Sequence, residues 1–170
     1  MKFKAEVYNF YDSALWGGHI SIPKKVADKF LKQKIKRVVC KLNDDHEFQC
    51  ALMSKGDGTY FININSDIRK KLKLKIGSEV EVELKKDESK YGLPLPKEFE
   101  ELLKIDDELN EVFHKLTPGK QRSLLHIIGK PKTSETRLNK AIVVSEYLKQ
   151  VNGKLDFKQL QQVFKDYNQR

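Results

Sequence analysis

The chain of 170 residues carries 33 lysines and arginines against 24 aspartates and glutamates, a formal net charge of +9. Its length fits one large or two small domains, and 39% hydrophobic with 34% charged residues is typical of a soluble globular protein. No apolar run approaches the roughly 18–20 residues of a membrane span, and two cysteines without a Cys-x-x-Cys motif exclude a disulfide scaffold. The first residues alternate like a strand and lack the apolar stretch of a signal peptide, so we expect a cytoplasmic protein. The positive charge fits a solvated surface or, less commonly, a surface for nucleic acid or an acidic partner.

The N-terminal half repeats one apolar pattern at an interval of 42 residues. Each copy predicts a strand, a short basic helix and a second strand. Two copies in one chain can bury their apolar faces against each other around a pseudo-two-fold axis. We therefore expect a small β-barrel over residues 1–88, which can close without a second chain and so allows a monomer. The repeated residues are Ile20, Ile22, Val26, Phe30, Val38, Cys40 and Leu42, followed by Ile62, Ile64, Ile68, Leu72, Val80, Val82 and Leu84.

In chain order, alternating apolar residues predict strands and amphipathic faces predict helices. Pro23 fits the start of the first helix, and Asn65 or Ser66 is expected to cap the second. The expected strands run over residues 3–8, 15–22, 35–42, 47–53, 59–64 and 80–84.

In the hairpin around Asn43, the positions of the apolar residues restrict which residues of the two strands can pair. A one-residue slip would bury Glu47 and Gln49, so we expect partners whose numbers sum to 90. Cys40 should then lie opposite Cys50 in the barrel interior. The two cysteines fit a redox pair or two packed, reduced core thiols, and a reducing cytosol favours the second.

Trp16 stands beside two glycines in the second expected strand. Glycines inside a strand suggest a bulge or a close backbone approach. Trp16 is therefore a candidate floor for a small pocket at the barrel mouth. The alternative is a core residue, because large aromatic side chains dominate core burial.

After a polar linker at residues 87–92, the second half predicts an all-α module over residues 93–170. Its apolar residues recur with helical spacing, and each expected helix follows a capping residue. The fold class is therefore α+β, a barrel followed by a helical module. The expected caps are Asp106 or Asp107, Thr117, Thr133 and Asp156.

Charge is segregated in this half: residues 94–114 have a net charge of −5 and residues 115–140 have a net charge of +6. One interpretation is a basic groove for phosphate or another anion. The other is an acidic helix pair docked on a basic helix pair, which is favoured because complementary charges on neighbouring helices are common. The candidate ligand-binding residues are Arg122, His126 and Lys130 on one helical stripe, with Lys132, Arg137 and Lys140 across a proline turn.

The second half contains three characteristic segments: Leu116-Thr117-Pro118-Gly119-Lys120-Gln121-Arg122, Lys130-Pro131-Lys132-Thr133-Ser134-Glu135-Thr136-Arg137 and Lys140-Ala141. On these segments, residues from about 93 to 150 resemble the YdeI/OmpD-associated module, whose name refers to bacteriocin protection and to association with an outer-membrane porin. This resemblance implies a stress or envelope connection and defines no biochemical activity.

The first half contains Phe3-x-Ala5, Trp16 before Ile22-Pro23, Gly56-Asp57-Gly58-x-Tyr60, and Ile68-Arg69-Lys70 before Ile76-Gly77. On these residues, the stretch 1–86 resembles a domain of unknown function found ahead of that module.

Two further segments are Ile22-Pro23-Lys24-Lys25-Val26 and Leu72-Lys73-Leu74-Lys75-Ile76-Gly77-Ser78-Glu79-Val80-Glu81-Val82. They are similar to the AbrB-like swapped-hairpin barrel, in which two chains each contribute one copy and the dimer binds DNA.

No motif in the chain indicates catalysis. The four histidines lack metal-ligand spacing, and no glycine-rich phosphate loop or nucleophile elbow occurs. We therefore expect no catalytic residue, no metal and no cofactor. The leading hypothesis is a non-catalytic cytoplasmic binding protein whose partner is a protein or a small anionic ligand. The alternatives are a nucleic-acid-binding regulator, suggested by the AbrB-like repeat and the charge, and an enzyme with a pocket at the domain junction.

Overall fold

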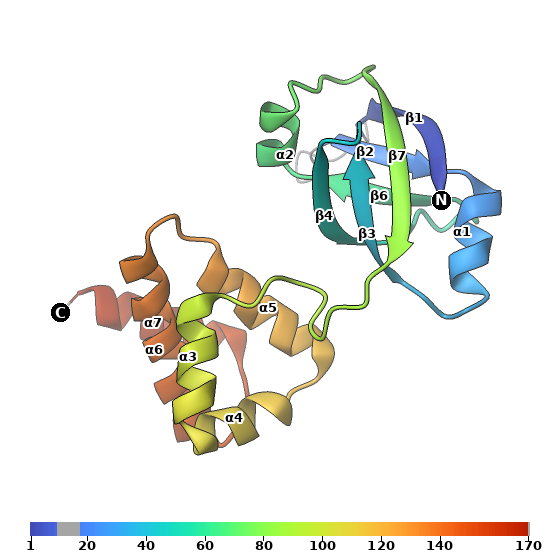
Figure 1. The fold of residues 1–170 in the computed structure, drawn as a ribbon. Coiled ribbons are helices and arrows are strands. Elements are labelled where there is room, and N and C mark those ends of the chain that lie inside the picture. Colours follow the sequence, from blue (N-terminus) through green and yellow to red (C-terminus); the bar gives the residue numbers. More distant parts are fainter. Residues whose placement is uncertain (10–17, 170) are drawn as a thin grey trace. The chain divides into compact units, whose positions relative to one another are not determined.

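The computed structural model describes residues 1–9 and 18–169 and divides the chain into two compact units, Met1–Glu88 and Ser89–Arg170 (Figure 1). The first unit is a nearly closed antiparallel barrel, and the second contains only helices, so the α+β class is confirmed. Trp16 and the start of the strand expected at 15–22 lie outside the described residues.

The barrel has seven strands in the order β4-β3-β7-β1-β2-β6-β5. It nearly closes because β4 and β5 are separated by Leu52 alone, so that one stretch of chain pairs with β3 at its start and with β6 at its end. The elements are β1 (Lys2–Tyr8), β2 (Gly18–Ile22), α1 (Lys24–Leu31), β3 (Arg37–Leu42), β4 (His46–Ala51), β5 (Met53–Ser54), β6 (Tyr60–Ile64), α2 (Ser66–Lys71) and β7 (Glu79–Lys86).

The strand registers establish the internal two-fold relation that the repeat predicts. Ile20 of β2 pairs with Ile62 of β6, and Lys41 of β3 pairs with Glu83 of β7. Each of these pairs joins a residue to its own counterpart 42 positions later in the sequence. A pseudo-two-fold axis must therefore pass through both pairs, and at one end it is surrounded by two fully buried isoleucines.

The first strand of each copy also obeys this relation, with a longer interval. Lys2 lies opposite Glu83 and Glu47 lies opposite Lys41, so Lys2 corresponds to Glu47, 45 positions later. The connection that follows this strand is therefore three residues longer in the first copy. A search at the interval of 42 does not find this part of the repeat. The interval of 45 aligns Phe3 with Phe48, Ala5 with Cys50, and Val7 with Leu52.

The expected register of the β3–β4 hairpin is wrong by two residues. Cys40 lies opposite Phe48 and Cys50 lies opposite Val38, so partner numbers sum to 88. The turn is tighter than expected, because Asn43 and Asp44 both adopt positive φ (51° and 54°) and the Asp45 N–H donates to the Leu42 carbonyl at 3.0 Å. A two-residue shift keeps every side chain on the same face, so alternation does not distinguish the two registers.

The two thiols remain neighbours inside the barrel in a diagonal arrangement. Both cysteines are free and buried. A hydrogen bond with Cys50, together with burial, raises the pKa of the Cys40 thiol. Because the thiolate is the reactive form, this environment suits packed core thiols better than a redox pair.

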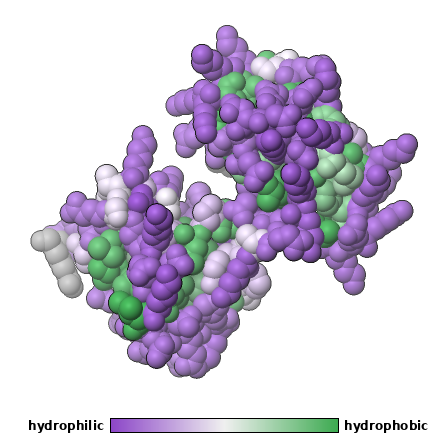
Figure 2. All heavy atoms as spheres, viewed as in Figure 1, coloured by the Kyte–Doolittle hydropathy of each residue, from purple (hydrophilic) through white to green (hydrophobic). Residues whose placement is uncertain are grey.

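The helical unit is organised around α6, which packs against each of the other four helices. Phe99, Phe113 and Leu148 are fully buried in its core, while hydrophilic residues cover most of the surface visible in Figure 2. The expected caps are confirmed, because Asp106, Thr117, Thr133 and Asp156 each accept a hydrogen bond from a backbone N–H of the following helix. The helices are α3 (Lys97–Ile105), α4 (Asp107–His114), α5 (Pro118–Gly129), α6 (Ser134–Gln150) and α7 (Phe157–Asn168).

Candidate anion-binding site

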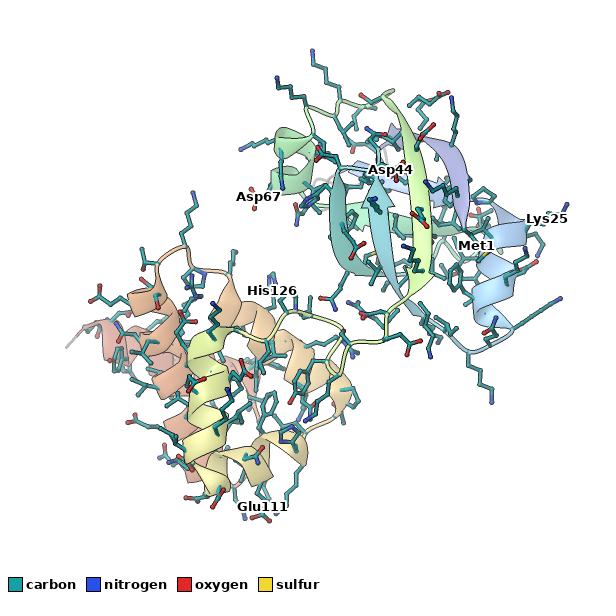
Figure 3. All side chains as sticks on the ribbon, in the orientation of Figure 1. Met1, Lys25, Asp44, Asp67, Glu111 and His126 are labelled. Carbon is teal, nitrogen blue, oxygen red and sulfur yellow. The ribbon has the colours of Figure 1, made fainter. Side chains whose placement is uncertain are left out.

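The predicted basic stripe lies on α5. Thr117 caps this helix through the Lys120 N–H at 3.4 Å, and Pro118 occupies its first turn, where a missing N–H costs nothing. The apolar face buries Leu124, Leu125 and Ile128. Helical periodicity then directs Arg122, His126 and Lys130 away from the core. His126 (labelled in Figure 3) and Lys130 are exposed, and Arg122 is half-buried.

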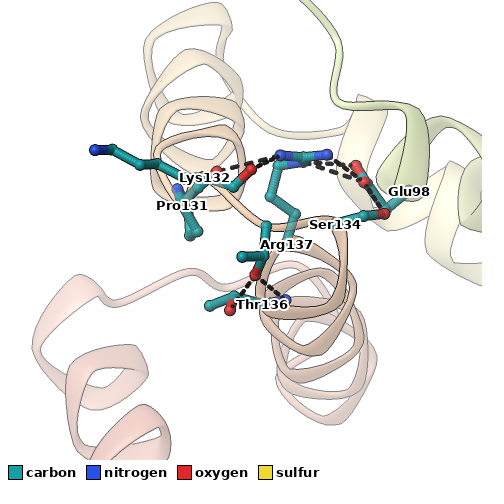
Figure 4. Close-up of polar contacts among 7 residues, drawn as sticks. Glu98, Pro131, Lys132, Ser134, Thr136 and Arg137 are labelled. Carbon is teal, nitrogen blue, oxygen red and sulfur yellow. Dashed lines mark hydrogen bonds and ion pairs between the residues drawn. The ribbon is translucent and has the colours of Figure 1, made fainter.

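Arg137, at the start of α6, is bound to other parts of the same unit (Figure 4). Its Nε donates to both carboxylate oxygens of Glu98 at 3.1 Å, and its Nη2 donates to Oε1 at 2.8 Å. Its Nη1 donates to the backbone carbonyls of Pro131 and Lys132 at 3.3 and 2.9 Å. Arg137 therefore ties α3 to the turn before α6, and this bidentate contact occupies the guanidinium.

Glu98 is the acceptor of this network. Its side chain is only 10% exposed and accepts a further hydrogen bond from the Ser134 hydroxyl at 2.6 Å. The hydrogen bonds from Arg137, and then from Ser134, lower the pKa of Glu98 to about 2. The ion pair is thus a structural contact between helices that lie far apart in the sequence.

The Glu98 contact predicts a specific loss of stability in acid. The folded-state pKa of about 2 lies below the usual value of 4.5, so the carboxylate stabilises the fold above about pH 4.5 and loses that contribution as the pH falls toward 2. Replacing Glu98 with glutamine should lower the melting temperature at pH 7, and the difference from the wild type should shrink between pH 5 and pH 3. Thermal melts followed by circular dichroism measure this. A matched Glu135→Gln variant, which changes an exposed carboxylate in the first turn of α6, should show no such convergence, and equal behaviour of the two variants would contradict the assignment.

The remaining candidate residues differ in their surroundings. Lys140 is half-buried, with its Nζ 5.6 Å from the centre of the Phe164 ring. Lys132 is exposed, and its carbonyl is held by Arg137. Among the described residues, no ion pair or side-chain hydrogen bond engages Arg122, His126, Lys130 or Lys132, which together we call the α5 cationic surface.

Docking of acidic helices on basic helices explains only part of the charge segregation. Glu98–Arg137 is such a contact, and Lys149 of α6 pairs with Asp106 at 2.6 Å. The other ion pairs that the acidic helices form within the described residues are local contacts with Lys104 and Lys115, on the same helices or directly after them. The α5 cationic surface has no such partner in the described part of the chain, so it stays available for a ligand.

The described residues contain neither a cluster suited to a metal ion nor a helix suited to spanning a membrane. Within residues 1–9 and 18–169, no group of three or more His, Cys, Asp or Glu side chains is placed to hold a metal ion. None of the described helices combines the length and apolar character needed to span a bilayer.

The geometry defines a two-unit protein in which a pseudo-symmetric barrel precedes a helical unit with an exposed cationic surface. Residues 3–84 match the family model of DUF1905, a domain of unknown function, and residues 93–150 match the model described as bacteriocin-protection, YdeI or OmpD-associated. The chain therefore combines a region that matches DUF1905 with a following region that matches the YdeI/OmpD-associated module. No curated protein and no solved structure matched the sequence. The last helix, α7, lies beyond the matched residues.

Proposed function

We propose that the protein is a non-catalytic, cytoplasmic binding protein whose α5 cationic surface docks an acidic segment of a partner protein. The observation that carries the proposal is the contrast between Arg137, whose guanidinium is bound by Glu98, and the four residues of the α5 cationic surface, whose side chains have no such partner within the described residues.

The shape of the surface favours an extended partner over a small ligand. Arg122, His126 and Lys130 follow one another at single-turn intervals, so they span about 12 Å along the helix. Lys132 follows shortly after α5 in the sequence, and its backbone carbonyl is held by Arg137. Basic side chains at regular intervals along a helix match carboxylates spaced along a chain, and such contacts speed association and give specificity.

The proposal is tested by binding of labelled poly-glutamate to the full-length protein. The triple variant Arg122→Gln/Lys130→Gln/Lys132→Gln should weaken binding by about tenfold, because it removes three contacts between charged groups near the surface that each contribute about 0.2–1 kcal/mol. The matched control is Lys154→Gln/Lys158→Gln/Lys165→Gln, which removes three exposed lysines from the same unit and should change the affinity by less than about twofold.

Three outcomes would contradict the proposal. Equal losses in the two triple variants would indicate a general effect of net charge. If the protein does not bind poly-glutamate at low salt, an acidic protein segment is excluded as the partner. Tighter binding of duplex DNA through the same residues, with log K falling steeply with log salt, would instead support the nucleic-acid alternative.

A further inference from the structure

A second cationic cluster surrounds a hollow on the barrel unit, at the end of α2. The hollow has a volume of about 330 Å³, and four of its six lining residues carry a positive charge. Within the described chain, the side chains of these four residues form no ion pair or hydrogen bond. The lining residues are Ser66, Arg69, Lys70, Lys73, Leu74 and Lys75.

In another hollow on the barrel, the lysine side chains lie beside carboxylates. This hollow of about 220 Å³ contains Lys2, Lys4 and Lys41, but also three carboxylates. Lys2 and Lys41 both pair with Asp44, at 3.3 and 3.2 Å. The α2 hollow has no carboxylate among its lining residues, so its charge is uncompensated.

The backbone fixes the cations around the hollow. The chain reverses at Lys73, which adopts a φ of 54°, and the Leu74 N–H donates to the Arg69 carbonyl at 2.8 Å. Lys75 is held in turn, because its N–H donates to the Ser78 hydroxyl at 2.9 Å. The next turn is anchored to β1 through the Gly77 N–H and the Val7 carbonyl at 2.7 Å. The two lysines after α2 are therefore brought back beside its last turn.

Arg69 is positioned more firmly than a surface arginine. Its Cδ lies 2.9 Å from where a Cβ would stand on Gly18, so its stem fills the space that a side chain at position 18 would occupy. Its Nε is buried, and no acceptor among the described residues reaches it. A buried N–H without an acceptor is destabilising, so an oxygen atom that a ligand brought within reach of it would be favoured.

The first copy of the repeat shows that the fold does not require a cation here. In α1, the Ile35 N–H donates to the Phe30 carbonyl at 2.9 Å, the same closing bond that Leu74 makes to Arg69. Phe30 is apolar and only 6% exposed. At this closing bond the second copy therefore has Arg69 where the first copy has the core residue Phe30, whereas the interval of 42 pairs Phe30 with Leu72.

Helix electrostatics explains only part of this cluster. Arg69, Lys70 and Lys71 lie in the last turn of α2, where cations interact favourably with the helix dipole. That effect does not account for the buried Nε of Arg69. It also does not account for Lys73 and Lys75, which lie beyond the helix.

We infer that the α2 hollow binds a compact oligophosphate, such as the triphosphate group of a nucleotide or inorganic triphosphate. Arginine contacts phosphate oxygens in a bidentate manner, and lysines add mobile point charges. Four cations around about 330 Å³ suit an anion with several negative charges in a small volume. The inference concerns a different unit and different residues from the proposed docking surface, so each can fail without the other.

Calorimetric titration of the full-length protein with inorganic triphosphate tests the inference. The triple variant Lys70→Gln/Lys73→Gln/Lys75→Gln should raise the dissociation constant by at least about tenfold, since hydrogen bonds to charged groups are among the stronger ones. The control Lys25→Gln/Lys34→Gln/Lys36→Gln removes the same charge from the first copy and includes Lys34, whose φ of 58° matches that of Lys73. The control should bind triphosphate within about twofold of the wild type.

Arg69→Met separates binding from folding. Methionine keeps much of the apolar stem but removes the buried donor, so the melting temperature of the free protein should not fall while triphosphate binding weakens by at least about tenfold. ATP compared with inorganic triphosphate shows whether a nucleoside adds affinity. The triple variant of the α5 cationic surface should bind triphosphate like the wild type.

The inference is overturned by any of four results. These are no binding of triphosphate to the wild type at low salt, sulfate binding as tightly as triphosphate, equal losses in the two lysine triples, and unchanged binding by Arg69→Met. Duplex DNA binding that depends on Arg69 and exceeds triphosphate binding would replace the oligophosphate with nucleic acid.

Discussion

Replacing Phe113 with alanine is expected to destabilise the helical unit by about 3–5 kcal/mol. The side chain is fully buried, and its ring lies 5.1 Å from that of Phe99 in an edge-to-face arrangement and 5.9 Å from that of Tyr91. Such aromatic pairs add to the loss of buried apolar area. A unit of this size is expected to have a stability of about 4–12 kcal/mol, so the variant should lose a large part of it.

Urea denaturation of the full-length protein, followed by circular dichroism at the helical minimum, measures this loss. Tyr167→Ala is the matched control, because this aromatic residue of the last helix is 39% exposed. Its replacement should change the free energy of unfolding by no more than about 0.5 kcal/mol. Similar losses in both variants would show that the core is not centred on the Phe99–Phe113 pair.

The apolar repeat made the barrel predictable, because seven matched positions in each copy restrict which faces can be buried. The helix starts were predictable for a different reason. A capping side chain acts on backbone groups two or three residues away, so the sequence shows both partners of the contact.

The hairpin register was not predictable from the same information. The two candidate registers bury the same side chains, and the choice depends on whether Asn43 and Asp44 both enter the left-handed region. Asparagine and aspartate tolerate that region without requiring it. The conformation of two turn residues therefore decided which residue faces Cys40.

For the candidate sites, the sequence shows which residues are charged but not which residues they contact. The positive charge of residues 115–140 is visible in the sequence, but Arg137 is engaged by Glu98, 39 residues earlier. Spacing on one helix contains no information about a carboxylate on another. The sequence does not predict the α2 hollow, because here the structure brings together cations that the sequence does not mark as a cluster. Arg69 and Lys70 looked like an ordinary basic helix end, and only the chain reversal at Lys73 brings the later lysines beside them.

The pseudo-two-fold axis predicts the second large effect, at Ile62. Its side chain is fully buried and pairs directly with Ile20, which occupies the same position in the other copy. Ile62→Ala should cost about 2–5 kcal/mol, and Ile20→Ala should cost a similar amount because the axis places both residues in related surroundings.

A double-mutant cycle with the milder valine substitutions keeps the barrel folded and tests the contact itself. Ile20→Val and Ile62→Val should each cost about 0.5–1.5 kcal/mol, and the double variant should depart from their sum by about 0.5 kcal/mol or more, because the two residues share one packing site. The two copies have diverged away from the axis, where the carbonyl that closes the short helix belongs to Phe30 in one copy and to Arg69 in the other, and where one connection is longer. Divergence of that kind is tolerated only while the residues at the axis keep their mutual packing. Additive losses, or alanine variants that differ widely in stability, would mean that the two copies no longer depend on each other at this point.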